Sequence, residues 1–226
     1  MSYGFIFDLD GLLIDTQLPF HALAESMIFD KYGLHLLPEE ISERYAGIST
    51  RKIFSELLPN EKADDLVKEK WEIMSSLVKA KAPVALPGMF EVCQFLKAKQ
   101  VPIIIASASP AFWIELCLDQ LINNSEHNFR EVFENNFVSA EECKNGKPAP
   151  DVFLLAKERL IKAGADEKIK WFVVGDGESD LMGGLAAEMD VLYLSSTNFN
   201  HDENERVKRF SDSVSLASYI RGIISS

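Results

Sequence analysis

The chain has 226 residues, of which 47% are hydrophobic, so it is long enough for one large domain or for a core domain that carries a smaller insertion. Its formal net charge of -12 and its pI near 4.8 argue against binding to nucleic acid or to an anionic membrane surface, because both need a positive field. An anionic substrate must therefore meet local positive charge.

The N-terminal sequence has no basic segment followed by a long apolar stretch, and no apolar run approaches the roughly 18 residues of a membrane span. We therefore expect a soluble, cytoplasmic protein. Cys93, Cys117 and Cys143 are widely spaced and include no Cys-x-x-Cys pair, which disfavours a disulfide framework or a zinc site. Buried or idle thiols are the expected state.

The first predicted element is a buried strand, Tyr3–Phe7, which runs directly into Asp8, Asp10 and Gly11. Two carboxylates two residues apart at a strand end project to the same side, and such close like charges are costly unless a cation or a reaction requires them. An ordinary Asp-Gly turn is the plain alternative. An EF-hand calcium loop is excluded, because that pattern needs its glycine sixth and an oxygen ligand fifth, where Leu12 stands.

The next region, residues 17–82, is predicted to be helical throughout. Its expected helices are Leu18–Tyr32, Pro38–Tyr45, Arg51–Leu58 and Glu61–Ala80. Two prolines and a glycine in residues 83–88 interrupt any helix and suit a paired hinge with Asp15 and Thr16. We therefore predict a helical cap domain, residues 17–82, inserted into a core of residues 1–16 and 83–226, where it can move as a lid.

In the rest of the chain, short apolar runs alternate with helical patterns. The expected strands are 101–106, 171–174 and 191–194, and the expected helices are 88–99, 150–163, 180–188 and, near the C-terminus, 214–224. Alternation of this kind is typical of a parallel sheet with crossover helices. The predicted fold class is α/β, a Rossmann-like parallel sheet core with an inserted all-helical cap domain. Residues 123–128 and 197–209 are expected to be surface loops.

Polar residues follow the predicted core strands, and in open α/β sheets the ligand crevice lies at the carboxyl ends of the strands. Ser107 and Ser109 follow one strand; Ser109 suits a helix N-cap and Pro110 the first helical position, where free N–H groups attract an anion such as phosphate. Simple capping by both serines is the alternative. Lys147 lies in a Gly/Pro-rich turn that would hold its charge against a phosphoryl oxygen, although most lysines are solvated.

Three acids, Asp176, Glu178 and Asp180, follow another strand. Asp176 and Asp180 are four residues apart near a helix start, so they can share one side and face Asp8 across the edge of the sheet. Oxygen ligands favour a hard cation, and Mg²⁺ typically takes few protein ligands together with waters and a phosphate oxygen. Compensation of the helix dipole is the alternative, and it suits Glu178 better than Asp176.

In this order, the motifs DLDGLLIDT, ASAS, GKPAPDVF and GDGESD resemble those of the haloacid dehalogenase superfamily. The helical insert is similar to subfamily I, which includes phosphoglycolate phosphatases, sugar-phosphate phosphatases and β-phosphoglucomutases. The resemblance extends from Phe5 to about Leu194. It implies a Mg²⁺-dependent phosphatase that hydrolyses a small phosphorylated metabolite, such as a sugar phosphate, through an aspartyl-phosphate. Dehalogenases lack an aspartate at the position of Asp10, which favours phosphoryl chemistry.

The resemblance also assigns roles to individual residues. It implies that Asp8 is the nucleophile and Asp10 the general acid and base, while Ser107 and Lys147 bind the transferring phosphoryl group. Further substrate contacts are expected from the backbone of Leu9 and Ala108, from Ser109, and from the cap-loop residues Gly47, Ser49 and Arg51. His21 lies one residue later than a histidine common in related chains, and a lone histidine is more often structural or solvated.

For the metal, the resemblance implies that Mg²⁺ is held by the Asp8 side chain, the Asp10 backbone carbonyl and Asp176, with Asp180 either binding it or supporting a ligand. A β-phosphoglucomutase-like transferase is one alternative, weakened because Pro110 and Ala111 stand where the mutase has polar substrate-binding side chains. A catalytically silent binding protein is the other. We expect a monomer or a weak dimer, with no nucleic-acid or membrane partner.

Overall fold

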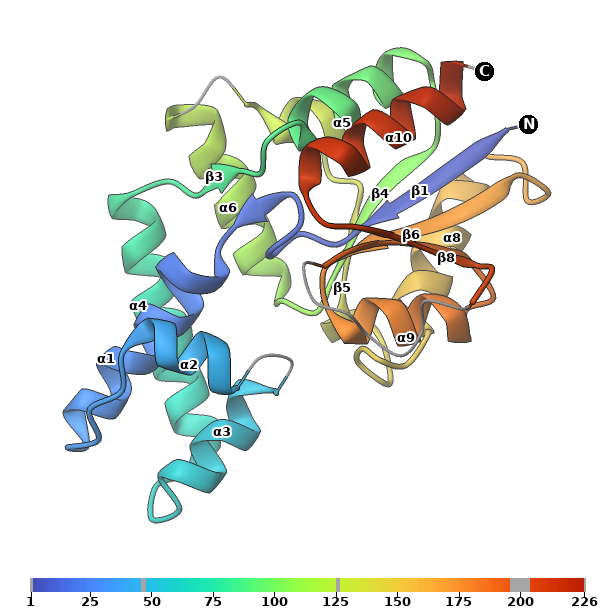
Figure 1. Ribbon diagram of the computed structural model, residues 1–226. Helices are drawn as coiled ribbons and strands as arrows, with labels where there is room; N and C mark the ends of the chain where they lie inside the picture. Colours follow the sequence, from blue (N-terminus) through green and yellow to red (C-terminus); the bar gives the residue numbers. More distant parts are fainter. Residues whose placement is uncertain (1, 46–47, 125–126, 196–203, 226) are drawn as a thin grey trace. The chain divides into compact units, whose positions relative to one another are not determined.

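The computed structural model describes residues 2–45, 48–124, 127–195 and 204–225 (Figure 1). The chain forms two compact units: Met1–Ile14 with Val84–Ser226, here called the core unit, and Asp15–Pro83, the helical unit. These bounds lie within two residues of the division expected from the sequence. No helix in the described part of the chain combines the length and apolar character needed to cross a membrane.

The core unit is built on a six-stranded parallel sheet with the strand order β5-β4-β1-β6-β7-β8 (Figure 1). The strands are β1 (Tyr3–Phe7), β4 (Ile103–Ser107), β5 (Phe137–Ser139), β6 (Lys170–Gly175), β7 (Asp190–Leu194) and β8 (Val207–Phe210). In the centre of the sheet, Phe7 of β1 is paired with Ile105 on one side and Val174 on the other. The predicted α/β class with a parallel sheet is confirmed.

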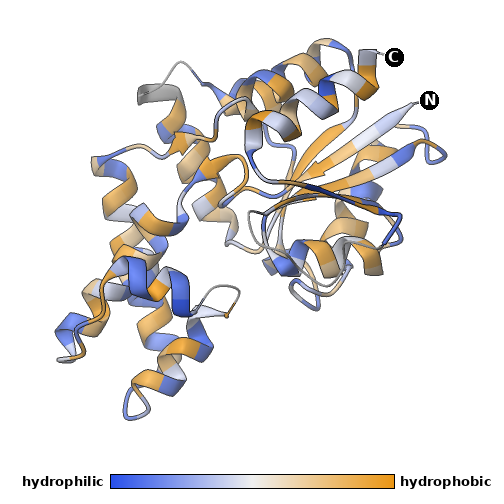
Figure 2. Ribbon diagram, viewed as in Figure 1, coloured by the Kyte–Doolittle hydropathy of each residue, from blue (hydrophilic) through white to orange (hydrophobic). Residues whose placement is uncertain are grey.

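Helices cover both faces of this sheet, which explains why its central strands are hydrophobic along most of their length (Figure 2). The helices are α5 (Met89–Ala98), α6 (Ala111–Asn124), α7 (Phe129–Phe133), α8 (Asp151–Lys162), α9 (Glu178–Ala186) and α10 (Ser213–Ser225), with a 3-10 turn at Ala140–Glu142. Ile6 belongs to a buried cluster with Phe153 of α8 and Leu181 of α9. Phe7 points to the opposite face and meets Phe133 of α7 edge-on. Successive side chains of β1 therefore pack against the helices on opposite faces of the sheet.

The helical unit has a hydrophobic core of its own. Its elements are a π-helix (Gln17–Ala22), α1 (Leu23–Lys31), α2 (Pro38–Arg44), α3 (Thr50–Leu57) and α4 (Ala63–Ala80). Phe29 and Phe54 meet edge-on at its centre, with ring centroids 5.6 Å apart. Two short strands, β2 (Ile14–Asp15) and β3 (Val84–Ala85), pair with each other where the chain leaves and re-enters the core unit.

In the described part of the chain, four strands and one α-helix were not predicted: β2, β3, β5 and β8, and α7. The expected surface loop 197–209 ends in β8, whose Phe210 is buried and lies against Tyr219 of α10 with ring centroids 5.3 Å apart. Lys208 remains exposed because β8 is at the edge of the sheet. Residues 196–203 lie outside the described part of the chain. The other expected loop, 123–128, begins later than predicted, because α6 continues to Asn124.

Candidate active site

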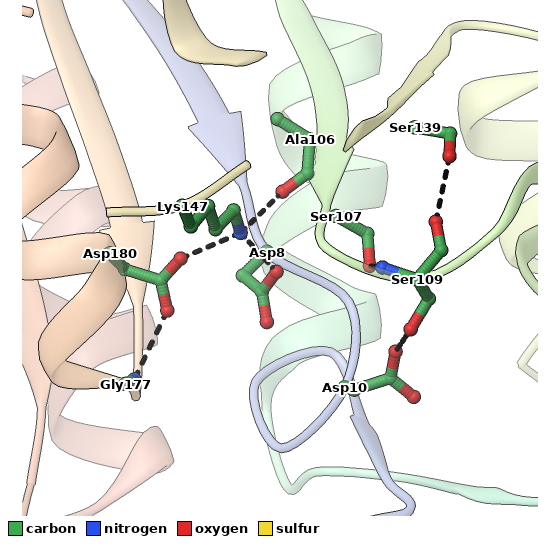
Figure 3. A network of polar contacts seen from close by, with 9 residues as sticks. All are labelled: Asp8, Asp10, Ala106, Ser107, Ser109, Ser139, Lys147, Gly177 and Asp180. Carbon is green, nitrogen blue, oxygen red and sulfur yellow. Dashed lines mark hydrogen bonds and ion pairs between the residues drawn. The ribbon is translucent and has the colours of Figure 1, made fainter. Parts of the chain in front are cut away.

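Residues from separate segments of the chain meet at the carboxyl edge of the sheet (Figure 3). Asp8 directly follows β1, Ser107 ends β4 and Asp176 follows β6, and these three strands are neighbours in the sheet. Lys147 comes from the loop that precedes α8. The fold therefore gathers charged and polar groups where open α/β sheets bind their ligands.

Lys147 is the buried cation of this edge. Its Nζ atom donates to Asp8 Oδ1 at 2.5 Å, to Asp180 Oδ1 at 2.6 Å and to the Ala106 carbonyl at 2.8 Å (Figure 3). Only 2% of its side chain is exposed, so it is not a solvated loop lysine. Burial by itself lowers the pKa of Lys147, but the nearby charges of Asp180 and Asp8 raise that pKa above its ordinary value. The ammonium group therefore keeps its charge.

Three carboxylates face this single ammonium group. Asp8, Asp176 and Asp180 each offer an oxygen atom, and these atoms lie within 4.8 Å of one another. Burial raises the pKa of Asp8 to about 7; the Lys147 charge opposes this rise and the Asp180 charge adds to it. Burial also raises the pKa of Asp176, and the charges of Asp8 and Asp180 add to that rise. The cluster holds more negative charge than its lysine compensates, and its donors are all oxygen, which fits a hard divalent cation.

Two glycines allow these acids to approach so closely. Gly11 has a φ of +88°, and a Cβ atom there would lie 2.3 Å from Asp176 Oδ2. A Cβ atom on Gly175 would lie 2.3 Å from the Cβ atom of Asp180. Asp180 is also fixed at the start of α9, because its Oδ2 accepts from the Gly177 N–H at 3.1 Å. Sequence analysis identified the acids, but it did not recognise that the glycines make room for them.

Asp8 and Asp10 have different partners, although two residues separate them. Asp10 Oδ2 accepts from the Ser109 hydroxyl at 2.6 Å, and its Oδ1 accepts from the indole N–H of Trp113 at 3.0 Å. The strand ends at Phe7, and Asp10 lies beyond it in an isolated bridge to Ile14, so alternation along a strand does not set the direction of that side chain. Trp113 is the residue that sequence analysis missed in this network. An indole in an apolar helix gave no signal of a polar role.

The two serines form part of the same edge, but they do not cap α6 as predicted. Ser107 Oγ accepts from the Ser109 N–H at 3.0 Å, and the Ser109 carbonyl accepts from Ser139 Oγ at 2.8 Å (Figure 3). Helix α6 begins one residue later than expected, with the Pro110 carbonyl accepting from the Ile114 N–H at 3.2 Å. Pro110 is therefore the cap residue, and the Ser109 hydroxyl is directed to Asp10 instead.

Two other expected substrate contacts also lie in the core unit. Leu9 is buried and its carbonyl accepts from the N–H groups of Leu13 and Ile14, whereas Ala108 is exposed.

The remaining residues expected in the site belong to the helical unit. Ser49 precedes α3, and Arg51 is exposed and forms an ion pair with Asp64 at 3.0 Å. Gly47 lies outside the described residues. His21 meets the Trp71 ring edge-on, with ring centroids 5.8 Å apart.

Residues 5–194 match the family model of the haloacid dehalogenase-like hydrolases. The chain belongs to this family. Among its haloacid dehalogenase-like relatives, a probable pseudouridine-5'-phosphatase of Drosophila melanogaster is 32% identical over 69% of this chain and 66% of its own length. A phosphorylated carbohydrates phosphatase of Thermotoga maritima is 28% identical over 83% of this chain and 82% of its own. A hydrolase from Pseudomonas syringae has the same fold, with 24% identity, a TM-score of 0.73 and coverage of 99% of both chains.

Proposed function

We propose that the protein is a Mg²⁺-dependent phosphatase that hydrolyses a small phosphorylated metabolite, such as a sugar phosphate, through a phosphoryl group transferred to Asp8. The observation that carries the proposal is the cluster of three carboxylates around the buried ammonium group of Lys147. The two named relatives, a probable pseudouridine-5'-phosphatase and a phosphorylated carbohydrates phosphatase, support a phosphorylated sugar as the substrate class.

In the first step, Asp8 attacks the phosphorus atom and the bond to the leaving oxygen breaks. Lys147 holds Asp8 Oδ1, which orients the carboxylate for this attack and offsets the charge of the incoming phosphate. Asp10 gives a proton to the leaving alcohol. In the second step, Asp10 takes a proton from water, the water oxygen attacks phosphorus, and inorganic phosphate leaves Asp8 free.

Asp8 and Asp176, together with the backbone carbonyl of Asp10, are the proposed ligands of Mg²⁺. Both oxygens of Asp180 already accept hydrogen bonds, from Lys147 and from the Gly177 N–H, so we assign Asp180 to supporting the cluster. The cation supplies charge compensation between the phosphate group and the carboxylates. Burial raises the pKa values of Asp8 and Asp176, and a divalent cation bound to these two carboxylates would oppose that rise.

The proposal is tested with p-nitrophenyl phosphate and a panel of phosphorylated metabolites, by measuring phosphate release with Mg²⁺ and with EDTA. We expect turnover that requires Mg²⁺ and is lost in Asp8→Asn. Asp166→Asn is the matched control, because Asp166 is exposed in the loop between α8 and β6. Activity retained in Asp8→Asn refutes the mechanism. Isomerisation of β-glucose 1-phosphate without net phosphate release would support a mutase instead.

A further inference from the structure

Both oxygens of the Asp10 carboxylate receive a hydrogen bond, and the two donors differ in kind. Trp113 Nε1 donates to Oδ1 at 3.0 Å, and Ser109 Oγ donates to Oδ2 at 2.6 Å. Asp10 is 7% exposed and Trp113 is completely buried. An indole N–H can only donate, whereas a hydroxyl group can donate or accept and can rotate.

The surroundings fix the Trp113 ring more firmly than the Ser109 hydroxyl. Trp113 lies in the first turn of α6, where its backbone N–H donates to the Pro110 carbonyl at 3.0 Å. The backbone of Ser109 is held from both sides, by Ser107 Oγ and Ser139 Oγ, but these contacts leave rotation of its own hydroxyl group possible. The Trp113 N–H therefore has a fixed role as donor to Oδ1, whereas the Ser109 hydroxyl can rotate and exchange Oδ2 for another partner.

We propose that Trp113 is a positioning residue that holds Oδ1 of Asp10 and thereby directs Oδ2 toward the reacting groups. This inference rests on the proposed phosphatase function. The proton moves from Asp10 Oδ2 to the leaving oxygen as its bond to phosphorus breaks, and it is restored to Oδ2 from the attacking water. A proton on Oδ1 would weaken its bond to the indole, because a protonated oxygen is a poorer acceptor and the indole N–H can only donate. The Ser109 hydroxyl holds Oδ2 between turnovers and rotates away during them.

The test compares two aryl phosphates of similar size with leaving groups of different basicity. p-Nitrophenolate leaves without a proton, whereas phenolate, which is more basic, depends on the general acid. In Trp113→Phe we expect kcat/KM for phenyl phosphate to fall about ten- to hundredfold, and kcat/KM for p-nitrophenyl phosphate to fall less than about threefold. A purely structural effect of the substitution would lower both values equally.

Two further variants make the comparison decisive. Replacing Trp113 by β-(3-benzothienyl)alanine keeps the ring shape but removes the N–H, and it should give the same pattern even where Trp113→Phe fails to fold. Trp171→Phe is the matched control, because Trp171 is buried in the same unit and its indole N–H donates to the Glu167 carbonyl at 3.2 Å. It should preserve the ratio of the two kcat/KM values.

The inference is overturned if both substrates lose activity equally in the Trp113 variants, or if neither does, while the unmodified protein turns over both. If the unmodified protein releases phosphate from neither ester, nor from the metabolite panel, then the proposed function fails and this inference fails with it.

Discussion

Replacing Asp8 by asparagine should stabilise the metal-free protein at pH 8 while it abolishes turnover. In the folded protein, burial raises the pKa of Asp8 to about 7, against an ordinary value of 3.8 that applies to the unfolded chain. Between pH 3.8 and about pH 7, Asp8 is protonated in the folded state but ionised in the unfolded chain, so the free energy of unfolding falls as the pH rises. Above about pH 7, Asp8 is ionised in both states, and the full cost of burying its charge is present.

The size of this penalty follows from the same two values. The difference between them corresponds to about 4 kcal/mol, since each pKa unit is worth about 1.36 kcal/mol. Asparagine is still a buried polar group beside Lys147, and it offers that lysine a weaker partner than a carboxylate. We therefore expect a net gain of about 1–3 kcal/mol in the free energy of unfolding.

The measurement is urea unfolding in EDTA at pH 5 and at pH 8. Asp8→Asn should be more stable than the unmodified protein at pH 8, and its advantage should shrink at pH 5, where the unmodified Asp8 is protonated. Mg²⁺ should stabilise the unmodified protein more than the variant. A variant that is less stable than the unmodified protein at pH 8 would refute the reasoning that burial makes the Asp8 charge costly. The control variant Asp166→Asn should change stability by less than about 0.5 kcal/mol.

Changing Gly11 to alanine should raise the Mg²⁺ concentration for half-maximal activity about tenfold, because the new Cβ atom would displace the Asp176 carboxylate. An unchanged Mg²⁺ requirement would contradict this prediction. Gly33→Ala is the control: Gly33 also has a positive φ, +77°, but nothing lies within 4 Å, so only stability should fall. In the helical unit, the buried Glu25 carboxylate forms an ion pair with Lys70 at 2.7 Å. Lys70→Met should lower the free energy of unfolding, measured in urea, by about 3 kcal/mol or more, because it leaves the buried charge of Glu25 without its cation. A loss below about 1 kcal/mol would argue against that pairing, and Lys70→Met with Glu25→Leu should recover part of the loss.

The central strands could be predicted because burial on both faces leaves a clear sequence pattern. Tyr3–Phe7 is a continuous run with no charge, and β1 has the predicted bounds. The edge strand β8 could not be predicted, because Lys208 and Arg209 interrupt its apolar pattern and its identity depends on pairing with β7. The three residues of β5 are too few to show any period.

Sequence analysis could predict the site residues that lie at the ends of strands. Asp8, Ser107 and Asp176 lie at the carboxyl ends of neighbouring parallel strands, so topology brings them to one edge of the sheet. The bond between Trp113 and Asp10 joins residues 103 positions apart through a helix whose other residues are mostly apolar, and no local pattern indicates it. The Ser109 cap was predicted wrongly because capping statistics consider only the local chain, whereas the hydroxyl bonds to Asp10.

The most direct test of the proposed mechanism is to trap the phosphoryl group on the enzyme. The protein is mixed with substrate and Mg²⁺, quenched in acid within milliseconds, digested and analysed by mass spectrometry. We predict one phosphorylated residue, Asp8, in the peptide that contains the start of the chain, and no such adduct in Asp8→Asn. Phosphate release with no adduct on Asp8 at any quench time, or an adduct on another residue, would contradict the account.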